Sequence, residues 1–516
     1  MESLSEGKQG MFKTSAVRCP QAEEVRELCR SIGLRLDKEQ DVQDFTEHMA
    51  KTFEAYQVVS DSVAPTLLVK YPRTPGYRPE PNDNKHNAWY WRCDIPGAPE
   101  GLLKGKRVGI KDNVCVAGVP MLNGSRLLEG YIPDIDASVV TRILDAGGRI
   151  LGKTHCEHMC YSGSSFTNDT GPTQNPVDPE RSSGGSSSGS AVAIKNGDVD
   201  MAIGGDQGGS IRIPASWVGI VGLKPTYGLV PYTGAISLET TIDHLGPMAA
   251  NVKDCALLLE AIAGYDSGLD SRQPSTMTCG KYSELLEVDL SGKRMGLLAE
   301  GFAGCEQDVQ NIVREAARKL GRLGVNVEEV SLPLHKEGVA IWTPIAIDGA
   351  YQCMVKGFGV GYMSKGYYNE SLMKKLRESF ALDVDKVSDP VKLMLLMGSY
   401  MEKNYGGQFY ARAQNLCIKL TRAYDALLET YDVLVMPTLP YKAPKLPCAT
   451  SRVSDRLNNA LGMIQNTAPF DISGHPAISI NAGFSENLPV GLQIVGAKFA
   501  DLTVLQFAAA LEKLIN

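Results

Sequence analysis

Residues 182–191 read Ser-Ser-Gly-Gly-Ser-Ser-Ser-Gly-Ser-Ala, and residues 205–215 read Gly-Asp-Gln-Gly-Gly-Ser-Ile-Arg-Ile-Pro-Ala. Small side chains allow the backbone N–H groups of such stretches to approach a bound group closely. In the second stretch, two glycines before Ser210 expose successive N–H groups, which is what a developing oxyanion requires. Ser210 is therefore the leading candidate for a nucleophile.

The first stretch fits two other motifs less well. Gly184 and Gly189 have the spacing of a phosphate-binding loop, but the lysine that such a loop requires is missing. The segment 185–189 matches the pattern G-x-S-x-G of a nucleophile elbow, with Ser187 in the middle. Such a match is common in a serine-rich run, so an α/β-hydrolase that uses Ser187 is the weaker enzymatic alternative. A flexible loop is the simplest non-functional interpretation of this stretch.

A lysine upstream provides a candidate base. Lys111 lies at the end of the predicted strand 107–116, after the apolar residues of Val-Gly-Ile. A serine hydroxyl becomes a nucleophile when a neighbouring base takes its proton, and a lysine does this only while it is neutral. Burial disfavours the charged form of a lysine, so this role requires Lys111 to lie in dry surroundings.

The rest of the chain predicts an α/β fold. Beyond Gly101, short β-rich runs alternate with stretches whose apolar residues recur at helical spacing, which is the pattern of a sheet covered by helices. The expected strands include residues 107–116, 150–154, 200–204, 294–298 and 433–436, and the expected helices include residues 252–263, 309–323 and 502–514. A mainly helical segment is expected at about 340–430.

The first hundred residues differ in character from the rest of the chain. Residues 21–33 and 42–49 have the apolar spacing of short amphipathic helices. Seven prolines between Pro65 and Pro99 predict an extended strap. We therefore expect a helical N-terminal extension with a proline-rich strap at 1–100 and a catalytic domain at 101–516. The extension is interpreted as a cap on the main body or, alternatively, as an element that forms a homodimer.

Composition excludes several classes of protein. With 52 Lys and Arg against 59 Asp and Glu, the net charge is −7, and no basic cluster indicates nucleic-acid binding. No window is apolar enough to cross a membrane, and the first residues do not resemble a signal peptide. Twelve cysteines lack the spacing of a disulfide framework. We expect a cytoplasmic protein with reduced thiols.

These residues resemble the amidase signature family over roughly Gly101 to Val495. The stretch 184–215 carries the resemblance, supported by Met-Pro-Thr at 436–438, by 466–477 and by 488–493. Gly205 and Gln207 are similar to those of the bacterial amidases found beside nitrile-converting enzymes, which have a helical N-terminal extension and commonly form dimers. The family usually has glycine at the position of Ser188, where a serine is strained if the turn needs a positive φ.

The resemblance implies a fold, a site and a reaction. The fold is a mixed twisted sheet sandwiched between helices. Lys111 corresponds to the base, Ser186 to a bridging serine after a cis peptide bond, and Ser210 to the nucleophile. The oxyanion hole corresponds to the amides of Gln207, Gly208, Gly209 and Ser210, and the substrate pocket to Tyr161, Ser187, Ile242 and Trp342.

The implied substrate is a small amide, which is hydrolysed to an acid and ammonia or an amine through an acyl-enzyme. Esters and carbamates (urethanes) present the same polarised carbonyl, so the sequence does not rank these three substrate classes. Neither a metal nor an organic cofactor is required. Rival functions are an amidotransferase A-type subunit that works with partner chains, a carbamate-specific hydrolase and a non-enzymatic binding protein.

Other candidate chemistry is less favoured. Residues 155–160 read His-Cys-Glu-His-Met-Cys, which by composition is a possible metal site. A Ser-His-Asp triad would need His244 beside Asp243, or His475 near Asp471, although a structural role is favoured for both histidines. Asp206 and Arg212 flank the nucleophile turn and are interpreted as bracing it rather than as binding substrate charges.

Overall fold

The computed structural model describes residues 17–448 and 450–515, and they form two compact units divided between Leu67 and Leu68. The first unit contains α1 (Ala22–Ile32) and α2 (Glu39–Asp61), which pack through Val25, Cys29 and Val42. Gln21 and Glu24 form a capping box that begins α1. Both helices predicted for this region are confirmed, and α2 is longer than expected.

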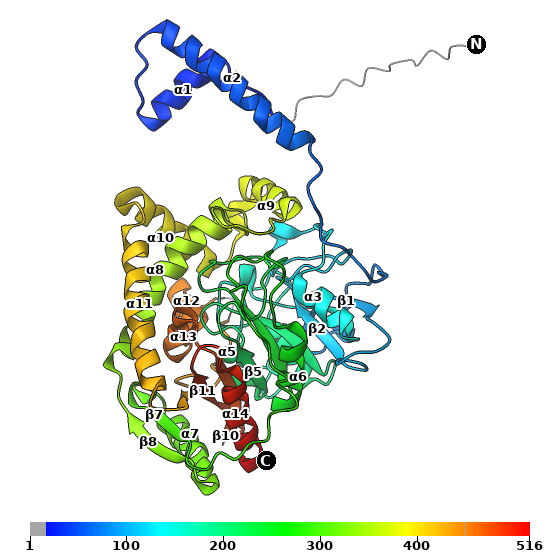
Figure 1. Cartoon of the computed structure of the whole chain (residues 1–516), viewed down its shortest axis with the longest axis vertical. Helices are drawn as coiled ribbons and strands as arrows, with labels where there is room; N and C mark the ends of the chain where they lie inside the picture. The colour runs from blue at the N-terminus through cyan, green and yellow to red at the C-terminus, as the bar shows by residue number, and fades with distance from the viewer. Residues whose placement is uncertain (1–16, 449, 516) are drawn as a thin grey trace, which may run out of the picture. The chain divides into compact units, whose positions relative to one another are not determined.

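A single large sheet organises the second unit (Figure 1). Its described strands are β1 (Trp89–Pro96), β2 (Arg107–Lys111), β3 (Arg149–Thr154), β4 (Met201–Asp206), β5 (Val221–Lys224), β6 (His244–Ala249), β7 (Arg294–Leu298), β8 (Asn326–Val330), β9 (Val433–Pro437), β10 (Ala477–Ser485) and β11 (Leu488–Gly496). Their order across the sheet is β1-β3-β2-β4-β6-β5-β10-β11-β9-β7-β8.

The sheet is mixed. Next to β1, which pairs antiparallel with β3, the strands β3, β2 and β4 are parallel neighbours, and at the other end β9, β7 and β8 are parallel. The strands between these groups pair antiparallel. The mixed α/β architecture is therefore confirmed, and so are the predicted strands, except that the strand predicted at 107–116 ends at Lys111.

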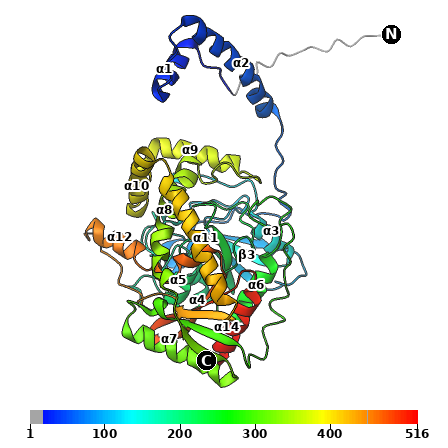
Figure 2. The ribbon, with the colours of Figure 1, turned by 60° about the vertical axis from the view of Figure 1, so that its left-hand side comes forward.

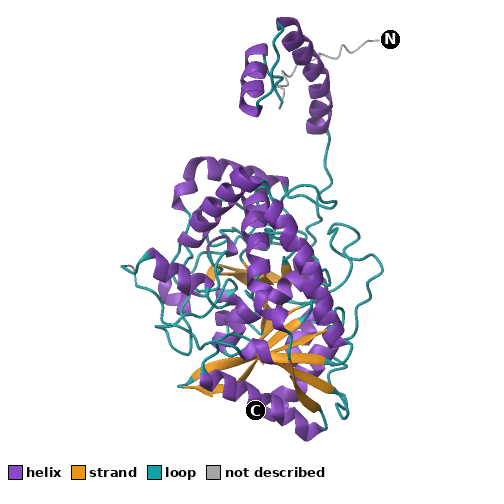
Figure 3. Cartoon of the chain, turned by 90° about the vertical axis from the view of Figure 1, so that its left-hand side faces the viewer, coloured by secondary structure: helices purple, strands orange, loops and turns teal. Residues whose placement is uncertain are grey.

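Helices lie around the strands (Figure 3). In the second unit they are α3 (Ser138–Asp145), α4 (Ser188–Lys195), α5 (Arg212–Val218), α6 (Val252–Ile262), α7 (Gln307–Lys319), α8 (Gly338–Ala350), α9 (Glu370–Asp383), α10 (Asp389–Tyr405), α11 (Gln408–Leu428), α12 (Val453–Leu461), α13 (Ala468–Ser473) and α14 (Asp501–Ile515). Figure 2 shows α8 beside α11, within the segment expected to be mainly helical. None of the described helices is long and apolar enough to cross a membrane.

The proline-rich region contains a strand that the sequence analysis did not predict. β1 pairs antiparallel with β3, and Trp89 and Ile95 are buried. Its prolines stand before the strand and at its end, so most of the segment keeps the N–H groups that a ladder needs. The sheet thus begins before residue 100, where the sequence analysis placed the domain boundary.

The sheet brings the predicted catalytic segments together. β2 and β4 are parallel, with Val108 opposite Met201 and Ile110 opposite Ile203. The carboxyl ends of parallel strands meet at one edge of a sheet, so Lys111 and the turn after Asp206 lie at the same edge.

The packing of the sheet predicts that two of its apolar side chains contribute differently to the free energy of unfolding. Leu492 on β11 is fully buried, whereas Phe484 on β10 is 58% exposed. We expect Leu492→Ala to lower the free energy of unfolding by about 2–5 kcal/mol and Phe484→Ala to lower it by about 0.5 kcal/mol. Urea unfolding followed by tryptophan fluorescence measures both, because all four tryptophans lie in the second unit. Equal losses would contradict the described packing.

Candidate active site

Lys111 is fully buried at the end of β2. Its Nζ donates to Ser186 Oγ at 2.8 Å and to the carbonyl oxygen of Gly205 at 3.0 Å. It makes no ion pair with any residue in 17–448 or 450–515. The amine is therefore directed at a hydroxyl, and no described carboxylate balances a positive charge on it.

Ser186 lies just before α4, and the peptide bond between Gly185 and Ser186 is cis. The next residue, Ser187, is also buried, and its Oγ donates to the carbonyl of Gly205 at 3.2 Å and accepts from the Gly205 N–H at the same distance. Ser187 therefore joins the start of α4 to the end of β4 by hydrogen bonds. Ser188 begins α4 and is not among the residues with positive φ, so the serine in place of glycine is accommodated without strain.

Ser210 lies in the turn that joins β4 to α5. The Ser187 N–H donates to the Ser210 carbonyl oxygen at 3.2 Å, which joins this turn to the segment that carries Ser186. No hydrogen bond joins the hydroxyls of Ser186 and Ser210 among the described contacts. The three predicted residues thus converge from three different segments, and the proton step between the two serines remains a proposal.

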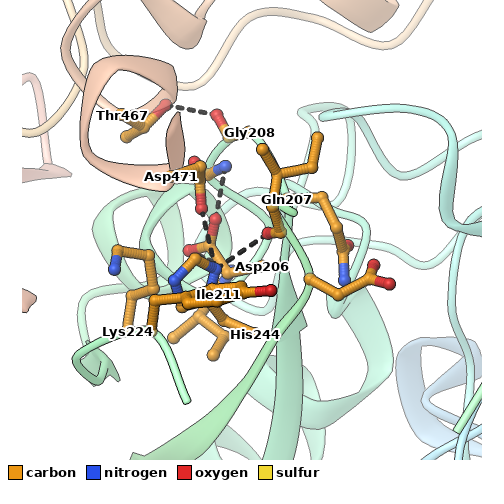
Figure 4. Close-up of polar contacts among 12 residues, drawn as sticks. Asp206, Gln207, Gly208, Ile211, Lys224, His244, Thr467 and Asp471 are labelled. Atoms are coloured by element: carbon orange, nitrogen blue, oxygen red, sulfur yellow. Dashed lines mark hydrogen bonds and ion pairs between the residues drawn. The ribbon is translucent and has the colours of Figure 1, made fainter. Parts of the chain in front are cut away.

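A buried ion cluster holds the Ser210 turn in place (Figure 4). Asp206 accepts hydrogen bonds from the N–H groups of Gly209 and Ile211, at 2.5 and 3.1 Å, and from Arg212 Nε at 3.0 Å. Arg212 also donates to Asp471 on α13 at 2.9 Å. Asp206 and Arg212 therefore brace the turn, as the sequence analysis favoured.

The carboxyl groups of this cluster have opposite pKa shifts. Burial favours the neutral form of Asp206, but the Arg212 guanidinium outweighs it and holds the pKa of Asp206 well below its usual value. Burial, together with the neighbouring charge of Asp206, raises the pKa of Asp471 well above its usual value. Arg212 thus favours the charged form of Asp206, whereas the surroundings of Asp471 favour its neutral form.

Two contacts orient the predicted oxyanion hole. Trp342 Nε1 donates to the carbonyl of Gln207 at 2.7 Å, and Thr467 Oγ1 donates to the carbonyl of Gly208 at 2.6 Å. A Cβ on Gly209, whose φ is +136°, would lie 2.5 Å from Thr467 Oγ1, so only glycine fits. The Gly209 N–H is already bound to Asp206, which leaves the amides of Gln207, Gly208 and Ser210 as the available predicted donors.

A small cavity of about 40 Å³ adjoins Ser210. Tyr161 and Trp342, both predicted for the substrate pocket, line it together with Gln207 and Gly208. Ile242 and Ser187, also predicted, are not among its lining residues: Ile242 is fully buried in the main core, and Ser187 lies within the α4 turn. Further lining residues, which the sequence analysis missed, are Cys160, Ser162, Gly163, Ile213, Leu238, Ala460, Leu461 and Ile464.

The two histidines considered for a Ser-His-Asp triad contact other residues. His244 Nδ1 contacts the Ile242 carbonyl at 2.8 Å, and His475 contacts Ser473 and Asp425, both at 3.0 Å. Neither histidine contacts a candidate nucleophile.

The two histidines of the His-Cys-Glu-His-Met-Cys run have different partners, whereas the thiols of Cys156 and Cys160 both contact Asn123 Oδ1. His155 contacts Asn87 and Thr170, whereas His158 contacts Asp169. No group of three or more metal-ligating side chains occurs in the part of the chain that the structure describes.

The sequence matches the Amidase family over residues 81–505. The chain belongs to the amidase family. It is 44% identical to an enantioselective amidase of Rhodococcus rhodochrous, over 88% of each chain. It is 38% identical to the A-type subunit of the glutamyl-tRNA(Gln) amidotransferase of Methanosarcina mazei, over 80% of this chain and 85% of the relative.

A solved structure supports the same assignment. The crystal structure of a bacterial aryl acylamidase of the amidase signature family superposes with a TM-score of 0.67 at 25% identity, covering 81% of this chain and 84% of that one. This amidase is therefore a hydrolase of amide C–N bonds.

The burial of His155 predicts how the stability of the amidase depends on pH. Burial lowers the pKa of His155 from 6.5 to about 4, so the unfolded chain takes up a proton on this residue before the folded chain does. The stability that neutral His155 provides is complete above pH 6.5 and is lost as the pH falls towards 4. We expect His155→Gln to flatten the decrease of the urea midpoint between these values. Replacing the exposed His48 by Gln is the control, and an unchanged slope in His155→Gln would refute the assignment.

Proposed function

We propose that this amidase hydrolyses small carboxylic acid amides to the acid and ammonia or an amine, with Lys111, Ser186 and Ser210 acting as one catalytic unit. The contact that carries the proposal is the 2.8 Å hydrogen bond from the buried Lys111 Nζ to Ser186 Oγ. A lysine amine that is held against a serine hydroxyl and makes no ion pair with a described carboxylate is placed to exchange a proton with that hydroxyl.

The proposed reaction has two halves. Neutral Lys111 takes a proton from Ser186, which takes the proton of Ser210 as Ser210 Oγ forms a bond to the substrate carbonyl carbon. The same proton then passes to the nitrogen as the C–N bond breaks, and ammonia or an amine leaves. Water attacks the acyl-enzyme by the same proton route and releases the acid. No cofactor takes part in these steps.

The surroundings of Ser210 support this chemistry. The amides of Gln207, Gly208 and Ser210 are the proposed donors to the oxyanion, and the buried charges of Asp206 and Arg212 keep their turn rigid. Ile213, Leu238 and Trp342 give the cavity apolar walls, which favour an uncharged acyl group. Esters and carbamates fit the same carbonyl chemistry and are proposed as further substrates.

The principal competing proposal is an amidotransferase A-type subunit, because a relative with that name shares 38% identity with the chain. The relative named as an amidase shares 44% identity and covers more of the chain. We therefore favour an enzyme that works without partner chains. Ammonia release from a simple amide by the purified chain alone supports this choice, and activity only with added partner chains would reverse it.

Substitution of the three residues tests the catalytic assignment. We expect Ser210→Ala, Ser186→Ala and Lys111→Ala each to lower kcat/KM for benzamide by at least about a thousandfold, because each removes a necessary proton-transfer or bond-forming group. Ammonia release measures the rate, and circular dichroism verifies folding.

Ser187→Ala is the matched control, because Ser187 neighbours Ser186 but bonds only to the backbone of Gly205 among the described side-chain contacts. We expect it to retain far more activity than Ser186→Ala. Near-native turnover in folded Lys111→Ala, or greater loss in Ser187→Ala than in Ser210→Ala, would overturn the catalytic assignment.

The first unit supports a further proposal, that the amidase is a cytoplasmic homodimer that pairs through its N-terminal extension. Ile32, Phe45, Tyr56 and Val59 on α1 and α2 are each more than half exposed within one chain. Apolar side chains gathered on two helices are typical of a surface that a partner covers.

Charge introduced on these helices tests the pairing. We expect the wild-type chain to have twice the 55.7 kDa chain mass in light scattering after size exclusion, and the double variant Ile32→Lys, Phe45→Lys to have the single-chain mass. The exposed Leu382→Lys, on α9, is the control. A wild-type chain that is monomeric at micromolar concentration would refute this proposal.

A further inference from the structure

Two buried amide side chains beside the catalytic residues have oxygens without a partner. Asn113 and Gln207 are 1% and 3% exposed, and Asn113 Oδ1 and Gln207 Oε1 accept no hydrogen bond from the described residues. Buried polar atoms in folded proteins are almost always hydrogen-bonded. Two such acceptors at one site therefore indicate a donor that the chain itself does not supply.

Tyr232 fixes which way both amides face. Its hydroxyl donates its only proton to the Ile236 carbonyl at 3.0 Å, and burial raises the pKa of Tyr232 so that this proton is retained. The phenol oxygen can then only accept hydrogen bonds. It accepts from Gln207 Nε2 at 3.0 Å and, through a longer contact, from Asn113 Nδ2 at 3.5 Å. Both nitrogens meet at Tyr232, so both oxygens are turned away from it.

The two amides lie beside the groups that move the proton. A Cβ on Gly205 would lie 3.4 Å from Lys111 Nζ and 3.6 Å from Asn113 Nδ2, so these two side chains flank the same glycine. Gln207 lines the cavity together with Ser210, and Figure 4 shows its side chain extending away from Asp471 and Lys224. Gln207 thus lines the cavity beside Ser210, and Asn113 lies next to Lys111 at Gly205.

We propose that Asn113 Oδ1 and Gln207 Oε1 bind the N–H groups of the scissile carboxamide, so that the enzyme selects primary amides, which release ammonia, over esters of the same acid. The inference rests on the proposed amide hydrolysis. A primary amide nitrogen has two hydrogens for two acceptors. The leaving oxygen of an ester carries no hydrogen. With an ester bound, both buried amide oxygens lack a donor and face the lone pairs of the ester oxygen.

The acceptors also suit the bond-breaking step. As Ser210 Oγ bonds to the carbonyl carbon and the C–N bond breaks, the nitrogen takes the proton from Ser186 and leaves as ammonia. The two original N–H groups stay bound to Asn113 and Gln207 during this change. These two residues thus set the orientation of the nitrogen and the specificity of the site, whereas Lys111 and the serines carry out the chemistry.

The test compares benzamide with methyl benzoate, which share one acyl group. We expect Asn113→Leu and Gln207→Met each to lower the ratio of kcat/KM for benzamide to kcat/KM for methyl benzoate by at least about tenfold, because each removes one acceptor at similar side-chain size. Tyr232→Phe removes the atom that orients both amides, and we expect it to lower the ratio in the same direction. Gln414→Met, in which an amide outside the cavity is lost, is the matched control and should keep the wild-type ratio.

A second measurement does not depend on whether the variants fold. For the wild-type enzyme, kcat/KM of each amide is divided by kcat/KM of methyl benzoate. We expect this ratio to be higher for benzamide than for N,N-dimethylbenzamide, because the dimethyl amide has no N–H. Ratios that stay at the wild-type value in folded Asn113→Leu and Gln207→Met would overturn the inference and leave the proposed function standing. A wild-type chain that hydrolyses none of the three substrates would overturn both.

Discussion

The proposed chemistry depends on an unpaired buried lysine. Lys111 has a hydroxyl and a carbonyl as its hydrogen-bond partners, although the next residue in the chain is an aspartate. Asp112 faces elsewhere: it pairs with Lys153 at 2.9 Å and accepts from the N–H groups of Leu122 and Asn123. Asp112 follows the last residue of β2, and its side chain and that of Lys111 have different partners. A carboxylate beside Lys111 would hold it in the charged form, in which it cannot act as a base.

The buried cluster of Asp206, Arg212 and Asp471 makes the Ser210 turn rigid. Asp206, Arg212 and Asp471 are fully buried and hydrogen-bonded to one another, and Asp206 also binds the backbone of the Ser210 turn. Taking such charges out of water is unfavourable unless the geometry is fixed. The cluster therefore fixes the turn whose remaining N–H groups are the proposed donors to a developing oxyanion, so the proposal requires little reorganisation during reaction.

The sequence predicted the local parts of this picture well. The strands that begin near 107, 150, 200, 294 and 433 could be recognised because their short apolar runs alternate with stretches whose apolar residues recur at helical spacing. The glycine-serine stretches indicated the turns before α4 and α5. Ser210 was proposed from the second of these stretches, Lys111 from the apolar residues before it and Ser186 from the family resemblance, and the catalytic roles of all three stay predictions. β1 was missed because the nearby prolines obscured it, although they lie outside most of the strand.

The walls of the cavity could not be predicted in the same way. Ala460, Leu461 and Ile464 reach it from segments some 250 residues beyond Ser210, and nothing in their local pattern distinguishes them from other apolar residues. Ile242 was expected in the wall but is packed in the core. The unpartnered oxygens of Asn113 and Gln207 depend on the position of Tyr232, which only the folded chain reveals.

The most direct test of the central claim uses a fluorophosphonate, which bonds covalently to an activated serine with loss of fluoride. After labelling of the purified enzyme, peptide mapping by mass spectrometry identifies the modified residue, and the labelling rate is compared between wild type and Lys111→Ala. The account predicts that Ser210 carries the label and that labelling slows by at least about a hundredfold in folded Lys111→Ala. A label on Ser187, or an equal rate without the lysine, would contradict it.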